Sequence, residues 1–346
     1  MSVRKSNFEL LRIIAMMMVI MWHFIVRCII NTVYGVQISV YQCDINGLGG
    51  VILPCSFLCI AVNLFVLISG YWSIRLTVKN VLNLYFLCLF YNLLAFVVLS
   101  YTESNSIKDL VKCFFITKTD NWFFPTYFWL MFFAPICNFC IQSMEINKLR
   151  IVVGLLVFLN VFSGYFAGFN ANANGYTVQH LILIYMIGGY IQRDAIELKS
   201  KICIFGYVLI AVINALLCFF FVKYTHLNGM YFFGYNNPLV IVESVLVFLF
   251  FKNIQFQSKS VNSLAKTVVA VLLIQDVVLR NIMVENLKSR LQDKDSYLSF
   301  LSHASLWLIF FFVAAYVIEQ IRRRIANRII EQIIGVLPKK ISKIQL

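Results

Sequence analysis

Arg12 and His23 stand inside the first long apolar segment of the chain. Residues 8–29 read FELLRIIAMMMVIMWHFIVRCI, and Arg12 and His23 interrupt this run. An ionisable side chain within a bilayer is costly and usually marks a functional path or a buried partner. Eleven residues make almost three turns of an α-helix, so both side chains share one face, about 16 Å apart along the axis. A permanent cation at one end and a titratable base at the other predict a reaction path along this face.

Both residues also have a purely structural interpretation. Glu9 is spaced to pair with Arg12 on the helix surface, and the arginine would then reach the inner headgroups. His23 would be a neutral, hydrogen-bonded packing residue. The residues by themselves leave both interpretations open.

Three further ionisable residues fall within apolar segments. Asp276 and Arg280 are four residues apart and are spaced to pair within one helix. Glu243 has no cation at helical spacing, so it needs a partner on another helix or stays protonated. The sequence offers three candidate partners for Glu243: His23, Arg27 and Arg280.

The composition indicates an all-α polytopic membrane protein. Of 346 residues, 61% are hydrophobic and 13% are charged, which is far from the balance of a soluble domain. The net charge of +14 is better explained by basic loops of a membrane protein than by nucleic-acid binding, because no RNA- or DNA-binding pattern is present.

Apolar runs close to the length needed to cross a bilayer predict about ten transmembrane helices. We place them at 8–29, 51–72, 81–100, 122–143, 151–168, 177–192, 202–222, 236–252, 265–284 and 298–318. Residues 1–318 form one membrane domain in this interpretation, followed by a tail at 319–346. Gly188-Gly189 and Ser69-Gly70 are expected to allow close approach of helices or a local break.

Lys and Arg are concentrated in alternate loops, which predicts that both termini lie in the cytoplasm. The tail alternates apolar and basic residues up to Pro338. It is typical of an amphipathic basic helix on the anionic inner leaflet, and anchoring is favoured over partner docking.

Other reactive residue types give weaker signals. Cys137-x-x-Cys140 lies in an apolar helix without a second pair or a nearby histidine, so packing is favoured over redox chemistry. His180 and His303 are expected at the outer interface, where a hydrated histidine is ordinary. No metal-ligand spacing, Walker motif or GxGxxG is present, so we expect no metal site and no bound cofactor.

Several segments resemble one family in order and spacing. NFELLRIIAMMMVIMWHF resembles the first helix of the integral-membrane acyltransferase family 3, whose hallmark is Arg, ten residues, then His. The remaining similar segments are AVNLFVLISGYW (61–72), NWFFPTYFWLMFFAPICN (121–138), LILIYMIGGYIQR (181–193) and NNPLVIVESVLVFLFFK (236–252).

This resemblance implies ten helices in the bacterial plasma (inner) membrane, acyl-CoA as donor and a carbohydrate hydroxyl as the usual acceptor. The essential histidine of the family corresponds to His23 in this sequence, and its arginine corresponds to Arg12. We then expect O-acetylation of a surface polysaccharide or its lipid-linked precursor, with acetyl-CoA as co-substrate. The expected partners are the carbohydrate, acyl-CoA, membrane lipid and, as a possibility, a second copy of the chain.

The expected roles follow from chemistry. His23 is the general base, oriented by Asp276 or Glu243. Arg12 holds the CoA phosphates, with Arg75 and Lys79 nearby. The remaining expected substrate-binding residues are Trp122, Asn63, Ser69 and Arg280, the first three as candidate donors to an oxyanion.

The sequence departs from the family pattern at two places. Gln275 stands before Asp276 where the family often has histidine, and Arg75 and Lys79 replace a common Arg-x-Arg pair. Two alternative functions therefore stay open: a transporter or flippase for an anionic or lipid-linked sugar, with intramembrane charges along its path, and an inactive accessory subunit.

Overall fold

A computed structural model of the chain describes residues 5–32, 35–36, 38, 43–100, 106–115, 121–167, 174–292 and 297–338. The longer helices are α1 (Ser6–Phe24), α4 (Ala61–Tyr71), α5 (Val78–Leu99), α7 (Phe123–Ser143), α8 (Ile146–Val161), α9 (Val178–Arg193), α10 (Ser200–Thr225), α11 (Pro238–Asn253), α14 (Arg280–Gln292) and α15 (Tyr297–Val336). The shorter ones are α2 (Ile45–Gly47), α3 (Leu53–Leu58), α6 (Ile107–Lys112), α12 (Lys259–Leu264) and α13 (Val268–Leu273).

Several helices continue into turns of different pitch. The π-helical segments are η1 (Ile25–Ile30), η3 (Leu48–Ile52), η5 (Phe162–Phe166) and η9 (Ile274–Val278). The 3₁₀ segments are η7 (Gly229–Phe233) and η8 (Ala265–Thr267). Two strands of two residues each, β1 (Asn31–Thr32) and β2 (Gly35–Val36), form a small antiparallel hairpin after η1.

The all-α membrane fold is confirmed. Among the described residues, nine helical stretches are long and apolar enough to cross a membrane, and each overlaps one predicted span. The other predicted span, 177–192, is the 16-residue helix α9, which is mostly buried in the bundle. The prediction for span nine is wrong at its end, because the helix stops at Val278 and the polar helix α14 begins at Arg280.

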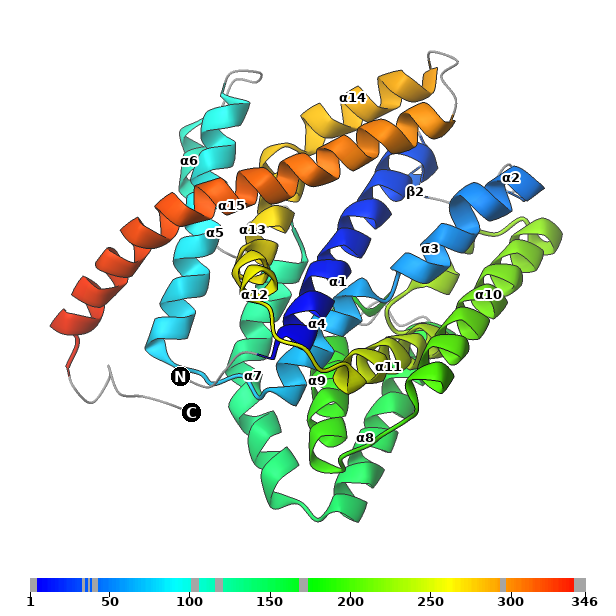
Figure 1. Ribbon diagram of the computed structural model, residues 1–346, viewed down its shortest axis with the longest axis horizontal. Helices are drawn as coiled ribbons and strands as arrows, with labels where there is room; N and C mark the ends of the chain where they lie inside the picture. Colours follow the sequence, from blue (N-terminus) through cyan, green and yellow to red (C-terminus); the bar gives the residue numbers. More distant parts are fainter. Residues whose placement is uncertain are drawn as a thin grey trace.

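Successive helices alternate in direction. In Figure 1 the connections α4–α5, α7–α8 and α9–α10 lie toward the bottom, and the end of α14 and the start of α15 lie side by side at the top. Side-chain caps begin several of the helices. Thr77 accepts from the backbone of α5, Thr177 from that of α9, and Asn237 from that of α11, where Pro238 fills the first turn.

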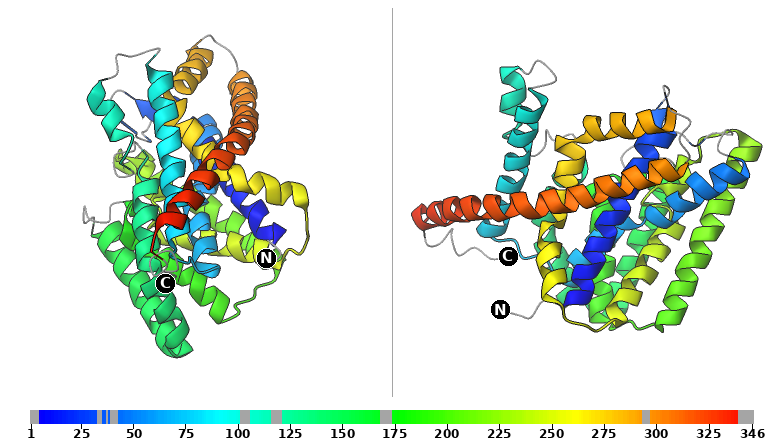
Figure 2. Two further views of the ribbon diagram at one scale, coloured as in Figure 1. Left: turned by 90° about the vertical axis from the view of Figure 1, so that its left-hand side faces the viewer. Right: turned by 45° about the horizontal axis from the view of Figure 1, so that its top comes forward.

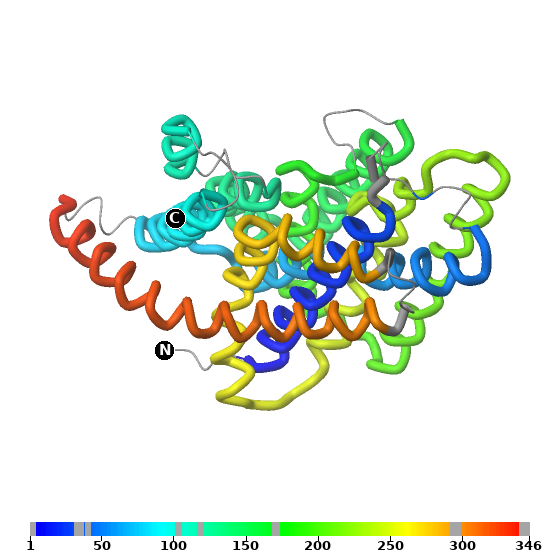
Figure 3. Tube along the Cα trace, turned by 90° about the horizontal axis from the view of Figure 1, so that it is seen from above, coloured from blue at the N-terminus to red at the C-terminus, as the bar shows by residue number. Residues whose placement is uncertain are grey.

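Helix α1 is the centre of the bundle. Phe8, Leu11 and Trp22 belong to a hydrophobic core shared with α4, α9 and α11, whereas Met16 and Val19 belong to a second core shared with α13 and α15. In Figure 3 α15 crosses α1, and the two helices are in contact. The helix that carries Arg12 and His23 is therefore held from both sides.

Helix α15 joins the last span to the tail without a break. It runs continuously through the predicted boundary between residues 318 and 319, with Glu319 and Arg322 buried. It crosses the outside of α5 and α13 as one long rod (Figures 1 and 2). The helix ends at Val336, close to Pro338 as the sequence predicts, and the tail beyond Pro338 lies outside the described residues.

Helices α4 and α9 approach most closely at two glycines. A Cβ atom on Gly70 would collide with the Tyr185 carbonyl, and one on Gly188 would collide with the Leu67 carbonyl. The expectation that Gly70 and Gly188 allow close approach agrees with this packing, which is typical of small residues at membrane helix interfaces.

We therefore expect Gly70→Ala to destabilise the protein by about 1–3 kcal/mol, because backbone atoms cannot move aside for the added methyl group. The measurement is the thermal unfolding midpoint in detergent. Gly154→Ala on α8 is the matched control, since a Cβ atom there meets nothing within 4 Å. Equal midpoints for the two variants would contradict the packing described here.

Candidate active site

His23 is held by a side chain from another helix. Its Nδ1 lies 2.7 Å from Oε1 of Gln275. Because the amide oxygen can only accept, the imidazole donates from Nδ1, and in the neutral ring the lone pair is then on Nε2. Gln275 therefore sets the tautomer that leaves Nε2 as the basic nitrogen.

Both helices that meet here change pitch at the site. Helix α1 becomes the π-helical η1 two residues after His23, and Gln275 and Asp276 lie within the π-helical η9. Turns of π-helix are rare and occur often at functional sites. Two consecutive residues of η9 have different polar partners: Gln275 contacts His23, and Asp276 contacts Arg27, Arg280 and Asn121.

Asp276 holds two arginines and an asparagine. Its carboxylate pairs with Arg27 of η1 and accepts from Nδ2 of Asn121, and Arg280 Nε lies 3.3 Å from Oδ1. Arg280 Nε also donates to the Asp276 carbonyl at 2.8 Å. The predicted pairing of Asp276 with Arg280 is present, and the two arginines exceed the single negative charge by one.

A small cavity lies beside the imidazole. It has a volume of about 50 Å³, and we call it the histidine cavity. Its wall includes His23, Met16 and Val19 of α1, Ala61 and Phe65 of α4, Asn121, Trp122 and Phe123 at the start of α7, and Tyr235. The wall is mainly apolar, and this is suited to excluding water from a reacting thioester or hydroxyl.

A larger basic cavity of about 730 Å³ lies toward the N-terminal end of α1, and we call it the arginine cavity. Five cations contribute to its wall: Arg12, Arg75, Lys266, Arg322 and Arg323. Arg12 also pairs with Glu9 at 3.1 Å, so the structural partner expected from the sequence is present while the guanidinium still lines the cavity. A concentration of cations of this kind is suited to phosphate groups.

The two cavities follow one another along the same three helices. On α1, Arg12 lines the arginine cavity and Met16, one turn further, lines the histidine cavity. The same step of four residues relates Ser69 to Phe65 on α4 and Tyr127 to Phe123 on α7. Residues four apart lie above one another on a helix, so the cavities are stacked about one turn apart between α1, α4 and α7.

The structure places the other predicted site residues differently. Glu243 is fully buried on α11, and neither of its carboxyl oxygens has a hydrogen-bond partner among the described residues. Asp276 is occupied by the arginines. Among the described residues, the side chain hydrogen-bonded to the imidazole is therefore Gln275, whereas the sequence suggested Asp276 or Glu243 for that role.

The three residues predicted as oxyanion donors are separated. Trp122 lies in the wall of the histidine cavity. Ser69 lines the arginine cavity and contacts the Tyr127 hydroxyl at 3.1 Å. Asn63 is fully buried, with Nδ2 donating to the Tyr235 carbonyl and Oδ1 2.9 Å from His180 Nε2. Trp122 is thus the one of the three that the structure brings to His23.

The expectation that His180 is hydrated at the outer interface is wrong. Its side chain is completely buried, and its two ring nitrogens lie within hydrogen-bond distance of Asn160 and Asn63. Asparagines on separate segments surround it, so burial is compensated by hydrogen bonds. His180 therefore connects α4, α8 and α9 as part of the framework.

Among the predicted phosphate-binding residues, Arg12 and Arg75 line the arginine cavity, and Lys79 is an exposed residue in the first turn of α5 that does not. The residues predicted from the sequence did not include Lys266, Arg322 and Arg323, which also line this cavity. The signal was present as a run of three arginines at 322–324, but a basic run after an apolar span is equally typical of a membrane anchor.

Fold and site together define a polytopic membrane protein in which a buried histidine and a group of cations face two stacked cavities. A family model described as an acyltransferase domain matches residues 5–319. This is most of the chain, and the protein therefore belongs to the integral-membrane acyltransferase family 3 and is an acyltransferase. No curated protein and no solved structure matches the chain.

Because Asp276 balances two arginines in a buried position, we expect Asp276→Ala to reduce stability by about 3–5 kcal/mol. The fall in the thermal midpoint of the purified protein measures this loss. Glu145→Ala is a suitable control, since Glu145 forms an exposed pair with Lys148, and exposed pairs contribute little. A midpoint for Asp276→Ala close to that of the control would show that the arginines do not depend on this carboxylate.

Proposed function

We propose that this acyltransferase moves an acetyl group from acetyl-CoA to a hydroxyl of a surface polysaccharide or its lipid-linked precursor, in the bacterial inner membrane. The observation that carries the proposal is the stacking of the arginine cavity and the histidine cavity between α1, α4 and α7. The arginine cavity can bind the anionic part of the donor, and the apolar histidine cavity next to it can hold the acyl group.

The arginine cavity takes the donor from the cytoplasmic side. Arg12 and Arg75 bind phosphate oxygens, since a guanidinium offers a planar fork of donors with a permanent charge. The distance from Arg12 to His23, about 16 Å along α1, is suited to the extended pantetheine arm. The thioester then lies in the histidine cavity, past Met16 and Val19.

His23 acts as the general base in a direct transfer. Nε2 takes the proton from the acceptor hydroxyl while its oxygen attacks the thioester carbonyl, and the C–S bond then breaks to release the CoA thiolate, which takes the proton back from the imidazolium. Gln275 keeps Nδ1 protonated throughout. The Trp122 indole N–H, in the same cavity, is the proposed donor to the oxyanion.

Aromatic side chains around the histidine cavity support a sugar acceptor. Trp122 contacts Tyr176 with ring centroids 4.6 Å apart and Tyr235 with centroids 5.6 Å apart. Tyr176 is 42% exposed. A rigid group of rings that runs from the cavity to the surface offers apolar faces for a sugar ring and hydroxyl groups for its polar edge.

We expect His23→Ala to abolish acetylation of the surface glycan, because removal of a positioned base typically lowers the rate by about 10²–10⁴-fold. Mass spectrometry of glycan from cells with the wild-type and variant protein measures the loss of acetyl groups, and membrane abundance should be unchanged. His303→Ala, at a half-buried position near the start of α15, is the control. Persistent acetylation in the His23 variant, or an acetylated His23, would contradict direct transfer with this base.

Gln275→Leu should lower kcat by about a hundredfold, since the imidazole is no longer held in its orientation. KM for acetyl-CoA should change little, because the residues proposed to bind acetyl-CoA are unchanged. Gln275→Glu keeps an acceptor oxygen at the same place and should retain most of the activity. Initial rates at saturating acetyl-CoA give the comparison. If both variants lose the same activity, the hydrogen bond to Nδ1 is not what matters.

A further inference from the structure

Two arginines of the basic tail line the arginine cavity instead of facing lipid. Arg322 and Arg323 follow the end of the family match at residue 319, on the part of α15 that the sequence assigns to membrane anchoring. Arg322 is only 8% exposed. A buried arginine is costly unless it is paired, so this position requires a specific partner.

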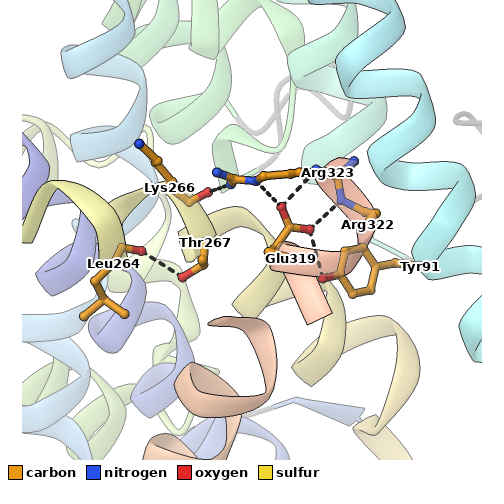
Figure 4. Close-up of polar contacts among 7 residues, drawn as sticks. All are labelled: Tyr91, Leu264, Lys266, Thr267, Glu319, Arg322 and Arg323. Atoms are coloured by element: carbon orange, nitrogen blue, oxygen red, sulfur yellow. Dashed lines mark hydrogen bonds and ion pairs between the residues drawn. The ribbon is translucent and has the colours of Figure 1, made fainter. Parts of the chain in front are cut away.

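Glu319 is that partner, and it fixes both arginines. Its carboxylate accepts from Arg322 at 2.5 and 2.9 Å and from Arg323 Nε at 2.7 Å (Figure 4). The Tyr91 hydroxyl of α5 donates to Glu319 at 3.1 Å, and Arg323 also donates to the Lys266 carbonyl. The tail is therefore attached to α5 and to the start of span nine at the wall of the cavity.

The opposite face of the same helix has the properties of an anchor. Arg324 and Arg328 are exposed, and exposed isoleucines at 321 and 325 lie beside them. Alternating apolar and basic residues of this kind suit a lipid surface. The tail arginines thus divide into two sets on one helix, and the buried set faces the cavity.

One carboxylate neutralises only one of two arginines, so the pair retains a positive charge toward the cavity. Lys266 adds a second cation to this wall, and Arg12 and Arg75, from other segments of the chain, also line the cavity. Arg12 shares a helix face with Met16 and Val19, which line the histidine cavity. An anion bound to Arg12 therefore lies closer to the histidine cavity than an anion bound elsewhere in the arginine cavity. The group at Arg322, Arg323 and Lys266 is therefore suited to a separate phosphate of the same ligand.

We propose that Arg322 and Arg323, positioned by Glu319, bind the terminal 3′-phosphate of the CoA donor. This rests on the proposed function and adds the tail to the donor site. The diphosphate at the end of the pantetheine arm is placed at Arg12, and the phosphomonoester, which carries about −1.5 to −2 charge, is placed at the arginine pair. Two adjacent guanidinium groups match the three terminal oxygens of a monoester.

Binding of CoA and of 3′-dephospho-CoA to the purified full-length protein in phosphatidylcholine nanodiscs tests this directly by calorimetry. The wild type is expected to bind CoA roughly ten- to a hundredfold more tightly, the effect of a few charge-assisted hydrogen bonds. Arg322→Gln/Arg323→Gln should lose this preference, and Arg324→Gln/Arg328→Gln should keep it. Equal affinity of the wild type for both nucleotides, or an unchanged preference in the first double variant, would overturn the proposal.

Two further variants distinguish a loss of phosphate binding from a loss of folding. Arg323→Gln leaves the buried pair of Arg322 and Glu319 in place and should still reduce the preference. Glu319→Gln keeps both arginines but frees them, and it should reduce the preference less than the double variant does. If neither variant changes the preference for CoA while the thermal midpoint stays at the wild-type value, the tail arginines do not bind the 3′-phosphate.

An anionic lipid headgroup is the other source of the same phosphate chemistry. Repeating the titrations in nanodiscs with phosphatidylglycerol separates the two, because a lipid site at the arginine pair would abolish the preference for CoA in the wild type. That result would overturn the proposal. A different pair of results would refute the proposed function instead. If the double variant loses the preference for CoA but the His23→Ala variant still acetylates glycan, the proposal for CoA binding is supported and the role of His23 is refuted.

Discussion

The end of the site that holds His23 depends on the ion pairs of Asp276. This one carboxylate connects η1 through Arg27, α14 through Arg280 and the start of α7 through Asn121. In an apolar medium each of these cations would be costly alone. The same contacts fix two neighbouring residues to which the proposed reaction assigns a role: Gln275 precedes the carboxylate, and Trp122 follows the asparagine.

A second group of ion pairs has the same role at the other end. Glu319 holds Arg322 and Arg323 and is held by Tyr91. Between the two groups, α1 is covered on both sides by hydrophobic cores, and along its polar stripe lie Arg12 and His23. The site thus consists of two cavities stacked along α1 with charged groups fixed at both ends, and in the proposed function this division separates an anionic donor head from a reacting acyl group.

Much of this arrangement can be predicted from the sequence. The spans follow from apolar length, and the shared face of Arg12 and His23 follows from helical spacing, because both are properties of one segment. The partner of His23 cannot be found in the same way. Gln275 is 252 residues away, and which face of span nine meets α1 depends on the packing of both helices and on the π-helical turn at Ile274–Val278.

The tail shows a second limit. Arg322 and Arg324 are the same residue type two positions apart, and composition treats them alike, yet one is buried in a cavity wall and the other is exposed. The difference arises because α15 continues through residue 319 and packs on α5, which a local pattern cannot reveal. Glu319, the single acid within this basic stretch before Glu331, is the one residue whose type indicates that a cation beside it is paired.

The central claim is that donor and base meet through the passage between α1, α4 and α7. An electron cryomicroscopy structure of the protein with bound CoA tests it most directly. We predict density for the phosphates in the arginine cavity and for the thiol in the histidine cavity, within reach of His23 Nε2. CoA bound elsewhere, or with its thiol directed away from His23, would contradict the account.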